Sequence, residues 1–76
     1  MNSFNIALGS INDVKDFVNI VSKYPVDIDL TSGRYVVDAK SIMGIFSLDL
    51  SKPIKVDIHD AGAVELYDEL VRFKVD

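Results

Sequence analysis

Apolar residues alternate with polar ones in three stretches of the chain, 4–8, 26–31 and 54–59. A period of two is typical of a strand with one buried face. Ser32 and Gly33 supply a turn after the second stretch, so residues 34–38 are expected to return beside it as the second strand of a hairpin. The sequence therefore predicts four strands. Their polar positions should line a sheet face open to solvent: Asp27, Asp29, Lys55, Asp57 and His59.

Between the first two strands the apolar spacing changes to three and four, at Val14, Phe17, Val18 and Val21. This spacing predicts a helix with one apolar stripe, which starts near residues 11–13 and ends before Pro25. Two N-cap residues compete. Ser10 with Asp13 three positions later resembles a capping box, and Asn12 is the alternative.

Two further helices are expected. Residues 41–48 are too continuously apolar for an amphipathic strand and begin with a good N-cap, Ser41. Residues 64–73 combine an apolar stripe with acidic residues early and basic residues late, which suits the helix dipole.

The order of elements is strand, helix, strand, strand, helix, strand, helix. It predicts an α+β fold, an open-faced two-layer sandwich in which a four-stranded antiparallel sheet carries three helices on one face. No stretch of the 76 residues is typical of a linker, so residues 1–76 are expected to form a single domain.

Composition excludes several classes of partner. Twelve acidic and eight basic side chains give a net charge of −4, which disfavours nucleic acid and anionic membrane surfaces. No apolar run is long enough to span a membrane, so we expect a cytoplasmic protein. The chain has no cysteine and therefore no disulfide.

The sequence also lacks the common signs of catalysis and metal binding. No Gly-rich phosphate loop, nucleophile triad or zinc-ligand spacing occurs. Glu65, Asp68 and Glu69 are explained as the solvated face of a helix, and Asp27 and Asp29 have no third ligand beside them. We expect no enzyme activity, no metal and no cofactor.

Residues 40–48, Lys-Ser-Ile-Met-Gly-Ile-Phe-Ser-Leu, are similar to the regulatory-serine segment of HPr, the phosphocarrier of the bacterial sugar phosphotransferase system. The resemblance continues without gaps through Ser22-Lys23-Tyr24 and the strand Asp27-Ile28-Asp29-Leu30. The family's order of elements matches the one derived above. The resemblance thus covers nearly the whole chain and implies the HPr fold.

The chain departs from the family at the start of the first helix, where HPr proteins have a Gly-Ile-His-Ala-Arg-Pro-Ala run. The ungapped register places Ser10 at the phosphorylated histidine, Asn12 at the arginine and Asp13 at the proline. A serine phosphate is a low-energy ester that does not pass its phosphoryl group on readily. His59, on the fourth strand, is expected to be a solvated histidine far from this loop rather than a phosphate acceptor.

Two other features follow from the resemblance. The family is phosphorylated at the serine matched by Ser41, although an ordinary N-cap explains this residue by itself. Ile42, Met43 and Phe46 have two interpretations, as core residues or as an exposed docking surface. The resemblance favours docking, because the family binds its partners with this surface.

The sequence therefore predicts an HPr-like, protein-docking regulator of bacterial sugar metabolism that does not carry phosphate on histidine. Its partners would be a serine kinase or phosphotransferase-system components, and we expect a monomer. One alternative is a phosphocarrier that uses Ser10 or His59 in a modified relay. The other is a scaffold or diverged paralogue without phosphate chemistry.

Overall fold

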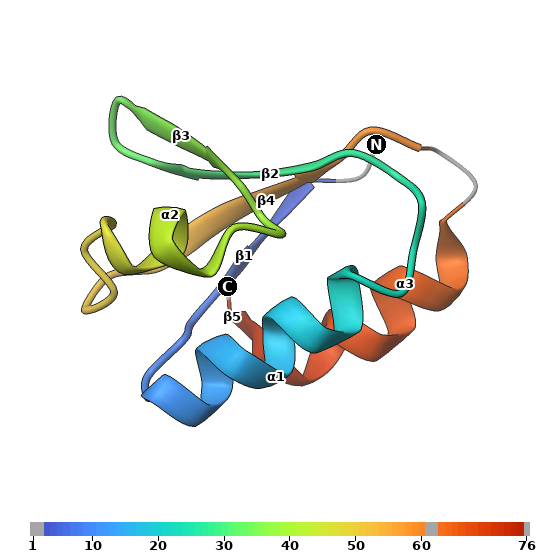
Figure 1. The fold of residues 1–76 in the computed structure, drawn as a ribbon, viewed down its shortest axis with the longest axis horizontal. Coiled ribbons are helices and arrows are strands. Elements are labelled where there is room, and N and C mark those ends of the chain that lie inside the picture. The colour runs from blue at the N-terminus through green and yellow to red at the C-terminus, as the bar shows by residue number, and fades with distance from the viewer. Residues whose placement is uncertain (1–2, 61–62, 76) are drawn as a thin grey trace.

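A five-stranded antiparallel sheet forms one layer of the molecule in the computed structural model, which describes residues 3–60 and 63–75 (Figure 1). The strands are β1 (Ser3–Ile6), β2 (Ile28–Ser32), β3 (Tyr35–Asp38), β4 (Ile54–Ile58) and β5 (Lys74–Val75). They lie side by side in the order β3-β2-β4-β1-β5. The first and fourth strands in sequence are therefore neighbours at the centre of the fold.

The second layer consists of three α-helices on one side of the sheet (Figure 1). They are α1 (Ile11–Val21), α2 (Ile42–Phe46) and α3 (Val64–Leu70), and α3 runs into a short 3₁₀-helix, η1 (Val71–Phe73). These elements confirm the predicted α+β sandwich with three helices over an antiparallel sheet.

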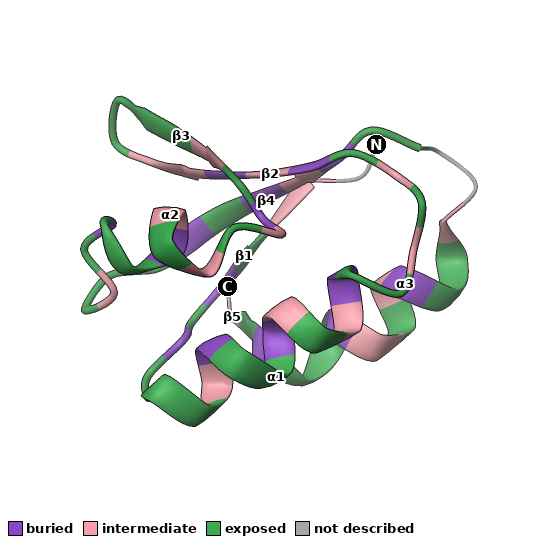
Figure 2. Ribbon diagram, in the orientation of Figure 1, coloured by how far each residue is buried: buried purple, intermediate pink, exposed green. Residues whose placement is uncertain are grey.

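The core lies between the two layers, where the helices turn their buried stripes toward the sheet (Figure 2). The predicted stripe of α1 is buried at Val14, Phe17 and Val21. The described residues include no buried polar or charged side chain, so hydrophobic burial dominates the stability of the domain. The buried residues are Ile6, Leu8, Val14, Phe17, Val21, Ile28, Leu30, Ala39, Ile45, Leu48, Ile54, Val56, Ile58, Leu66, Leu70 and Phe73.

The opposite face of the sheet is open and polar, as predicted. Asp29 lies opposite Asp57 and Thr31 lies opposite Lys55 in the β2–β4 register. Two residues of the predicted row fall just outside the strands: β2 begins after Asp27, and β4 ends before His59. The His59 amide still donates to the Asp27 carbonyl at 2.9 Å, so the two chains stay paired beyond the strand ends.

The end of the chain differs from the prediction of one long helix and a four-stranded sheet. The α-helix stops at Leu70, η1 buries Phe73, and Lys74–Val75 pairs with Asn5 and Ile6 as a fifth strand. The Ala7 amide also donates to the Phe73 carbonyl at 2.9 Å. This pairing satisfies backbone groups on the outer side of β1 that a four-stranded sheet would leave without partners.

Across residues 3–60 and 63–75, no helix has the length and apolar content that a membrane crossing requires.

Candidate functional site

The junction of β1 and α1 carries Ser10, Asn12 and Asp13, the residues that the sequence resemblance assigns to the family's active loop. Ser10 is the N-cap of α1, and its hydroxyl oxygen accepts a hydrogen bond from the Asp13 amide at 3.1 Å. The Asp13 carboxylate in turn accepts from the Gly9 amide at 3.1 Å. Ser10 is thus confirmed as the N-cap, while the Asp13 side chain bonds the Gly9 amide and not the Ser10 amide of a standard capping box. The alternative N-cap, Asn12, is wrong because it lies within the helix.

This arrangement determines what the helix N-terminus can bind. Free N–H groups at such an end attract anions. Here Ser10 occupies one of them and the Asp13 carboxylate already brings a negative charge. The nearby carboxylate makes this helix end unfavourable for a second anion such as phosphate.

A shallow hollow of about 530 Å³ lies beside this junction. It brings the active-loop position of Ser10 together with Phe46 of α2, although the two residues are far apart in sequence. All the residues that line it are uncharged: Leu8, Gly9, Ser10, Ile11, Phe46, Leu50 and Ser51. The lining therefore offers a bound phosphate no positive charge.

Helix α2 is capped in the same way as α1. The Ser41 hydroxyl accepts from the Gly44 amide at 3.1 Å, and Ser41 is exposed. A Cβ at Gly44 would approach Ser41 Oγ to 3.2 Å and Val37 Cβ to 3.3 Å, so a glycine allows α2 to lie close against β3. Ser41 is thus confirmed as the predicted N-cap of α2, and the residue is exposed to solvent.

The apolar side chains of α2 divide into two groups. Ile45 is buried and Ile42 is partly buried against the core, whereas Met43 is 76% exposed and Phe46 is 42% exposed. Ile42 thus belongs partly to the core, which was one of its two predicted interpretations. Met43 and Phe46 are three residues apart and lie on neighbouring turns of the helix.

Ile11 extends this exposed surface onto α1, where it is 63% exposed and lines the same hollow as Phe46. Sequence reasoning missed it. The available signal was an apolar residue in the first turn of α1 that lies outside the stripe of Val14, Phe17 and Val21. We call Ile11, Met43 and Phe46 the apolar patch.

The matched residues Lys23 and Tyr24 have a structural role. Lys23 Nζ lies 2.8 Å from a Glu69 carboxylate oxygen, and the Tyr24 hydroxyl donates to the other oxygen. The hydrogen bond to Glu69 raises the pKa of Tyr24 to about 12, while Lys23 and then Tyr24 lower the pKa of Glu69. Glu69 therefore links α3 to the segment that follows α1, and is not simply part of a solvated helix face. Lys40 Nζ donates to the Tyr24 carbonyl at 2.6 Å.

His59 lies at the other end of the sheet from Ser10. β1 runs antiparallel to β4, so Ser10 follows the end of β1 that pairs with Ile54, whereas His59 follows Ile58 at the opposite end. His59 Nε2 lies 2.9 Å from an Asp29 carboxylate oxygen, and this hydrogen bond raises the pKa of the imidazole. His59 is thus a partly exposed histidine on the open face, paired with a carboxylate.

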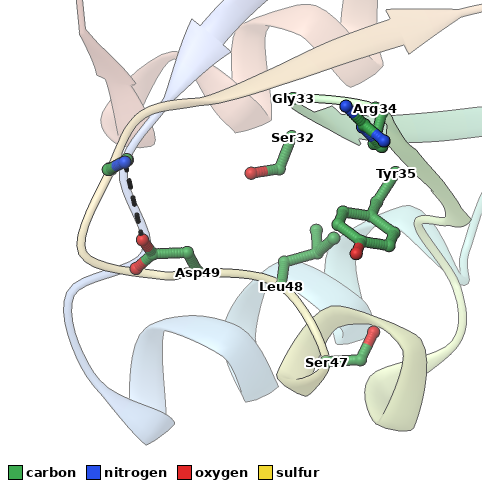
Figure 3. Close-up of a pocket in the computed structure, with 8 residues that line it drawn as sticks. Ser32, Gly33, Arg34, Tyr35, Ser47, Leu48 and Asp49 are labelled. Atoms are coloured by element: carbon green, nitrogen blue, oxygen red, sulfur yellow. Dashed lines mark ion pairs between the residues drawn. The ribbon is translucent and has the colours of Figure 1, made fainter.

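A second hollow, of about 510 Å³, lies between the β2–β3 turn and the segment after α2 (Figure 3). None of the predicted site residues lines it. Figure 3 shows Tyr35 pointing toward Ser47 and Leu48, and the ion pair of Asp49 with Lys52, whose nitrogen lies 3.9 Å from the carboxylate. Among the residues that the structure describes, no group of three His, Cys, Asp or Glu side chains could hold a metal ion.

Two solved structures resemble this fold. The crystal structure of HPr-C-His from Thermoanaerobacter tengcongensis has a TM-score of 0.79 and 28% identity, over 95% of this chain and 89% of that chain. The phosphocarrier protein HPr from Bacillus anthracis str. Ames has a TM-score of 0.73 and 23% identity, over 97% and 94%. The second similarity is one of fold alone.

The family model described as the PTS HPr component phosphorylation site matches residues 13–74, well over half of the chain. The matched segment starts beyond Ser10 and Asn12 and contains Ser41 and all of α2. Together with the shared fold, this match confirms the resemblance seen in the sequence. The chain belongs to the HPr family, the phosphocarriers of the bacterial sugar phosphotransferase system.

Proposed function

We propose that this HPr-family chain is a regulatory docking module that does not carry phosphate at the active-loop position. The observation that supports this most strongly is the surface around Ser10. An uncharged hollow there adjoins an exposed apolar patch, and the neighbouring helix end holds a carboxylate. Apolar surface of this kind favours protein contact, and the absence of positive charge from the lining disfavours a phosphate.

The chemistry of the available nucleophiles supports the same proposal. A phosphate on Ser10 would be a stable ester close to the Asp13 carboxylate, which accepts from the adjacent Gly9 amide. His59 is held by Asp29 at the opposite end of the sheet. Neither residue suits a relay that passes through the loop before α1.

The module would act by binding and not by catalysis, in the cytoplasm, as its family does. Its partners are proteins, namely phosphotransferase-system components or the kinase of the regulatory serine. Both similar structures carry the name HPr, and one of them is called a phosphocarrier. Their fold, rather than their phosphate chemistry, is what we transfer to this chain.

A labelling experiment tests the proposed loss of phosphate transfer. Incubation with the general phosphotransferase enzyme and labelled phosphoenolpyruvate should leave the wild-type chain unlabelled, because no imidazole lies at the loop. A histidine-bearing HPr in the same tube is the positive control and should take up label. Label on the wild-type chain would contradict the proposal. Acid-labile label that is lost in His59→Gln would identify His59 as the carrier, and acid-stable label that is lost in Ser10→Ala would identify Ser10.

We further propose that Ser41 is a phosphorylation site that controls docking. Its hydroxyl is exposed and lies at the N-terminal end of α2, beside the surface that carries Met43 and Phe46. Negative charge at a helix N-terminus is favourable, and it would change the surface that a partner meets.

The family's serine kinase should therefore label the wild-type chain and fail to label Ser41→Asn. Asparagine retains N-cap capacity, so the variant removes the hydroxyl while keeping the helix end satisfied. Ser47→Ala, at the other end of α2, is the matched control and should be labelled like the wild type. An unlabelled wild-type chain would favour the scaffold alternative over regulation at Ser41.

A further inference from the structure

β3 is an edge strand of the sheet, paired only with β2 among the described strands (Figure 1). Its residues Tyr35 and Val36 are exposed, Val36 by 61%. An edge strand presents unpaired N–H and C=O groups that can pair with another strand.

The hydrogen-bonding pattern of the hairpin determines which backbone groups of β3 point outward. Ser32 lies opposite Tyr35 across the two-residue turn Gly33-Arg34, where Gly33 has the positive φ of 60° that a turn of this kind needs at its first position. At the other end of the hairpin the Ala39 amide donates to the Ile28 carbonyl at 2.9 Å.

In an antiparallel pair the hydrogen-bonded residues alternate along each strand. Residues 35, 37 and 39 therefore direct their backbone groups toward β2. Val36 directs both of its backbone groups toward the open edge, and the turn residue Arg34 lies at the end of that edge. The Asp38 amide points the same way, whereas the Asp38 carbonyl already accepts from the Ser41 amide at 3.0 Å.

The two edges of the sheet are protected to different degrees. β5 is only two residues long and includes Lys74, and short length and lysine are both features that discourage pairing at an edge. β3 has four residues, with β-branched Val36 and Val37 and neither proline nor lysine. β3 is thus the edge that is suited to extension of the sheet.

We propose that β3 pairs, antiparallel, with β3 of a second copy of this chain, in a register centred on Val36. In this register Val36 lies opposite Val36 of the second copy and can exchange both backbone hydrogen bonds with it. Arg34 lies opposite Asp38 of the second copy, and by symmetry this charge pair forms twice. The proposal goes beyond the docking module above, which needs no second copy, and it replaces the sequence-based expectation of a monomer.

The available charges favour this register over its neighbours. Arg34 makes no ion pair within residues 3–60 and 63–75, and its exposed side chain is available. Asp38 uses Oδ1 for the Lys40 amide at 2.8 Å and is also exposed.

A register that keeps the hydrogen-bond phase can shift only in steps of two residues. One such step places Arg34 opposite Lys40 and so brings like charges together. The opposite step places Arg34 against Val36 and leaves its charge without a partner. Only the register centred on Val36 matches backbone and charge together.

Exchange of charges between two variants tests the register. In the Arg34→Asp variant, positions 34 and 38 both carry carboxylates. In the Asp38→Arg variant, both positions carry guanidinium groups. Each variant alone should fail to self-associate because like charges face one another. A mixture of the two should associate again, because both cross-strand pairs then have opposite charges.

The edge is shorter than a standard interface, so association should be weak and is best followed by NMR at high protein concentration. In the wild type the amide signals of Val36 and Asp38 should shift with concentration, and those of Tyr35 and Val37 should shift less. Arg72→Asp makes the same change of charge away from the edge and should self-associate like the wild type. Concentration-independent spectra of the wild type would overturn the proposal.

A second pair of variants leaves Asp38 and its hydrogen bond from the Lys40 amide unchanged. Val36→Glu and Val36→Lys each place like charges directly opposite one another, so neither should self-associate, and their mixture should. Val36 is exposed, so we expect both variants to fold. Self-association of either variant alone, or no association in the mixture, would rule out the register centred on Val36.

Discussion

The variant Phe17→Ala should lower the free energy of unfolding by about 3 to 5 kcal/mol, the usual cost of emptying a buried phenylalanine site. Phe17 is 0% exposed at the centre of the α1 stripe, and its ring meets Phe73 edge-on with the ring centroids 5.9 Å apart. The loss thus affects both the helix layer and the 3₁₀ turn that leads into β5. A core of this size nets only about 3 to 5 kcal/mol in total, so the variant should be largely unfolded at 25 °C.

Urea denaturation followed by circular dichroism measures this effect. Phe46→Ala is the matched control, because it removes the same ring from a side chain that is 42% exposed and should leave most of the stability intact. Equal destabilisation by the two variants would contradict the assignment of Phe17 to the core and Phe46 to the surface.

The second large effect is expected in binding. Met43→Asp should weaken docking of the protein partner by at least about thirtyfold, since truncation of a central contact residue costs about 2 kcal/mol or more and a charge there is worse. Met43 is 76% exposed, so the fold should be unchanged. The loss would therefore report on the surface alone.

The measurement compares wild-type and variant chains as immobilised bait for the partner that the wild type captures from a bacterial extract. Val64→Asp is the control, because Val64 is a similarly exposed apolar residue, 64%, at the start of α3 and outside the apolar patch. Undiminished capture by Met43→Asp, or equal loss in both variants, would exclude Met43 from the docking surface.

The sequence predicts most of the architecture because the dominant elements have a clear period and clear ends. The stripe of α1 and the capping by Ser10 and Ser41 are local features, and local residues are enough to define them. The open polar face follows from alternation alone, because neighbouring side chains on a strand point to opposite faces.

The features that escape prediction depend on contacts distant in sequence. Lys74–Val75 is too short to show a period and becomes a strand only because β1 offers it backbone partners. Glu69 is typical of an exposed helix position until Lys23 and Tyr24 are brought beside it. Ile11 joins the apolar patch only because the fold places Phe46 on the same hollow.

The position of β1 in the sheet has a consequence for the speed of folding. β1 lies between β4 and β5, so the strand that leaves the ribosome first finds its partners about fifty and seventy residues later, at Ile54–Asp57 and Lys74–Val75. Large loops must close before these pairs form, and such non-local topologies fold more slowly than helical bundles of the same size. During synthesis the β2–β3 hairpin can form early. The middle of the sheet, where β4 lies between β2 and β1, can form only after β4 has been made.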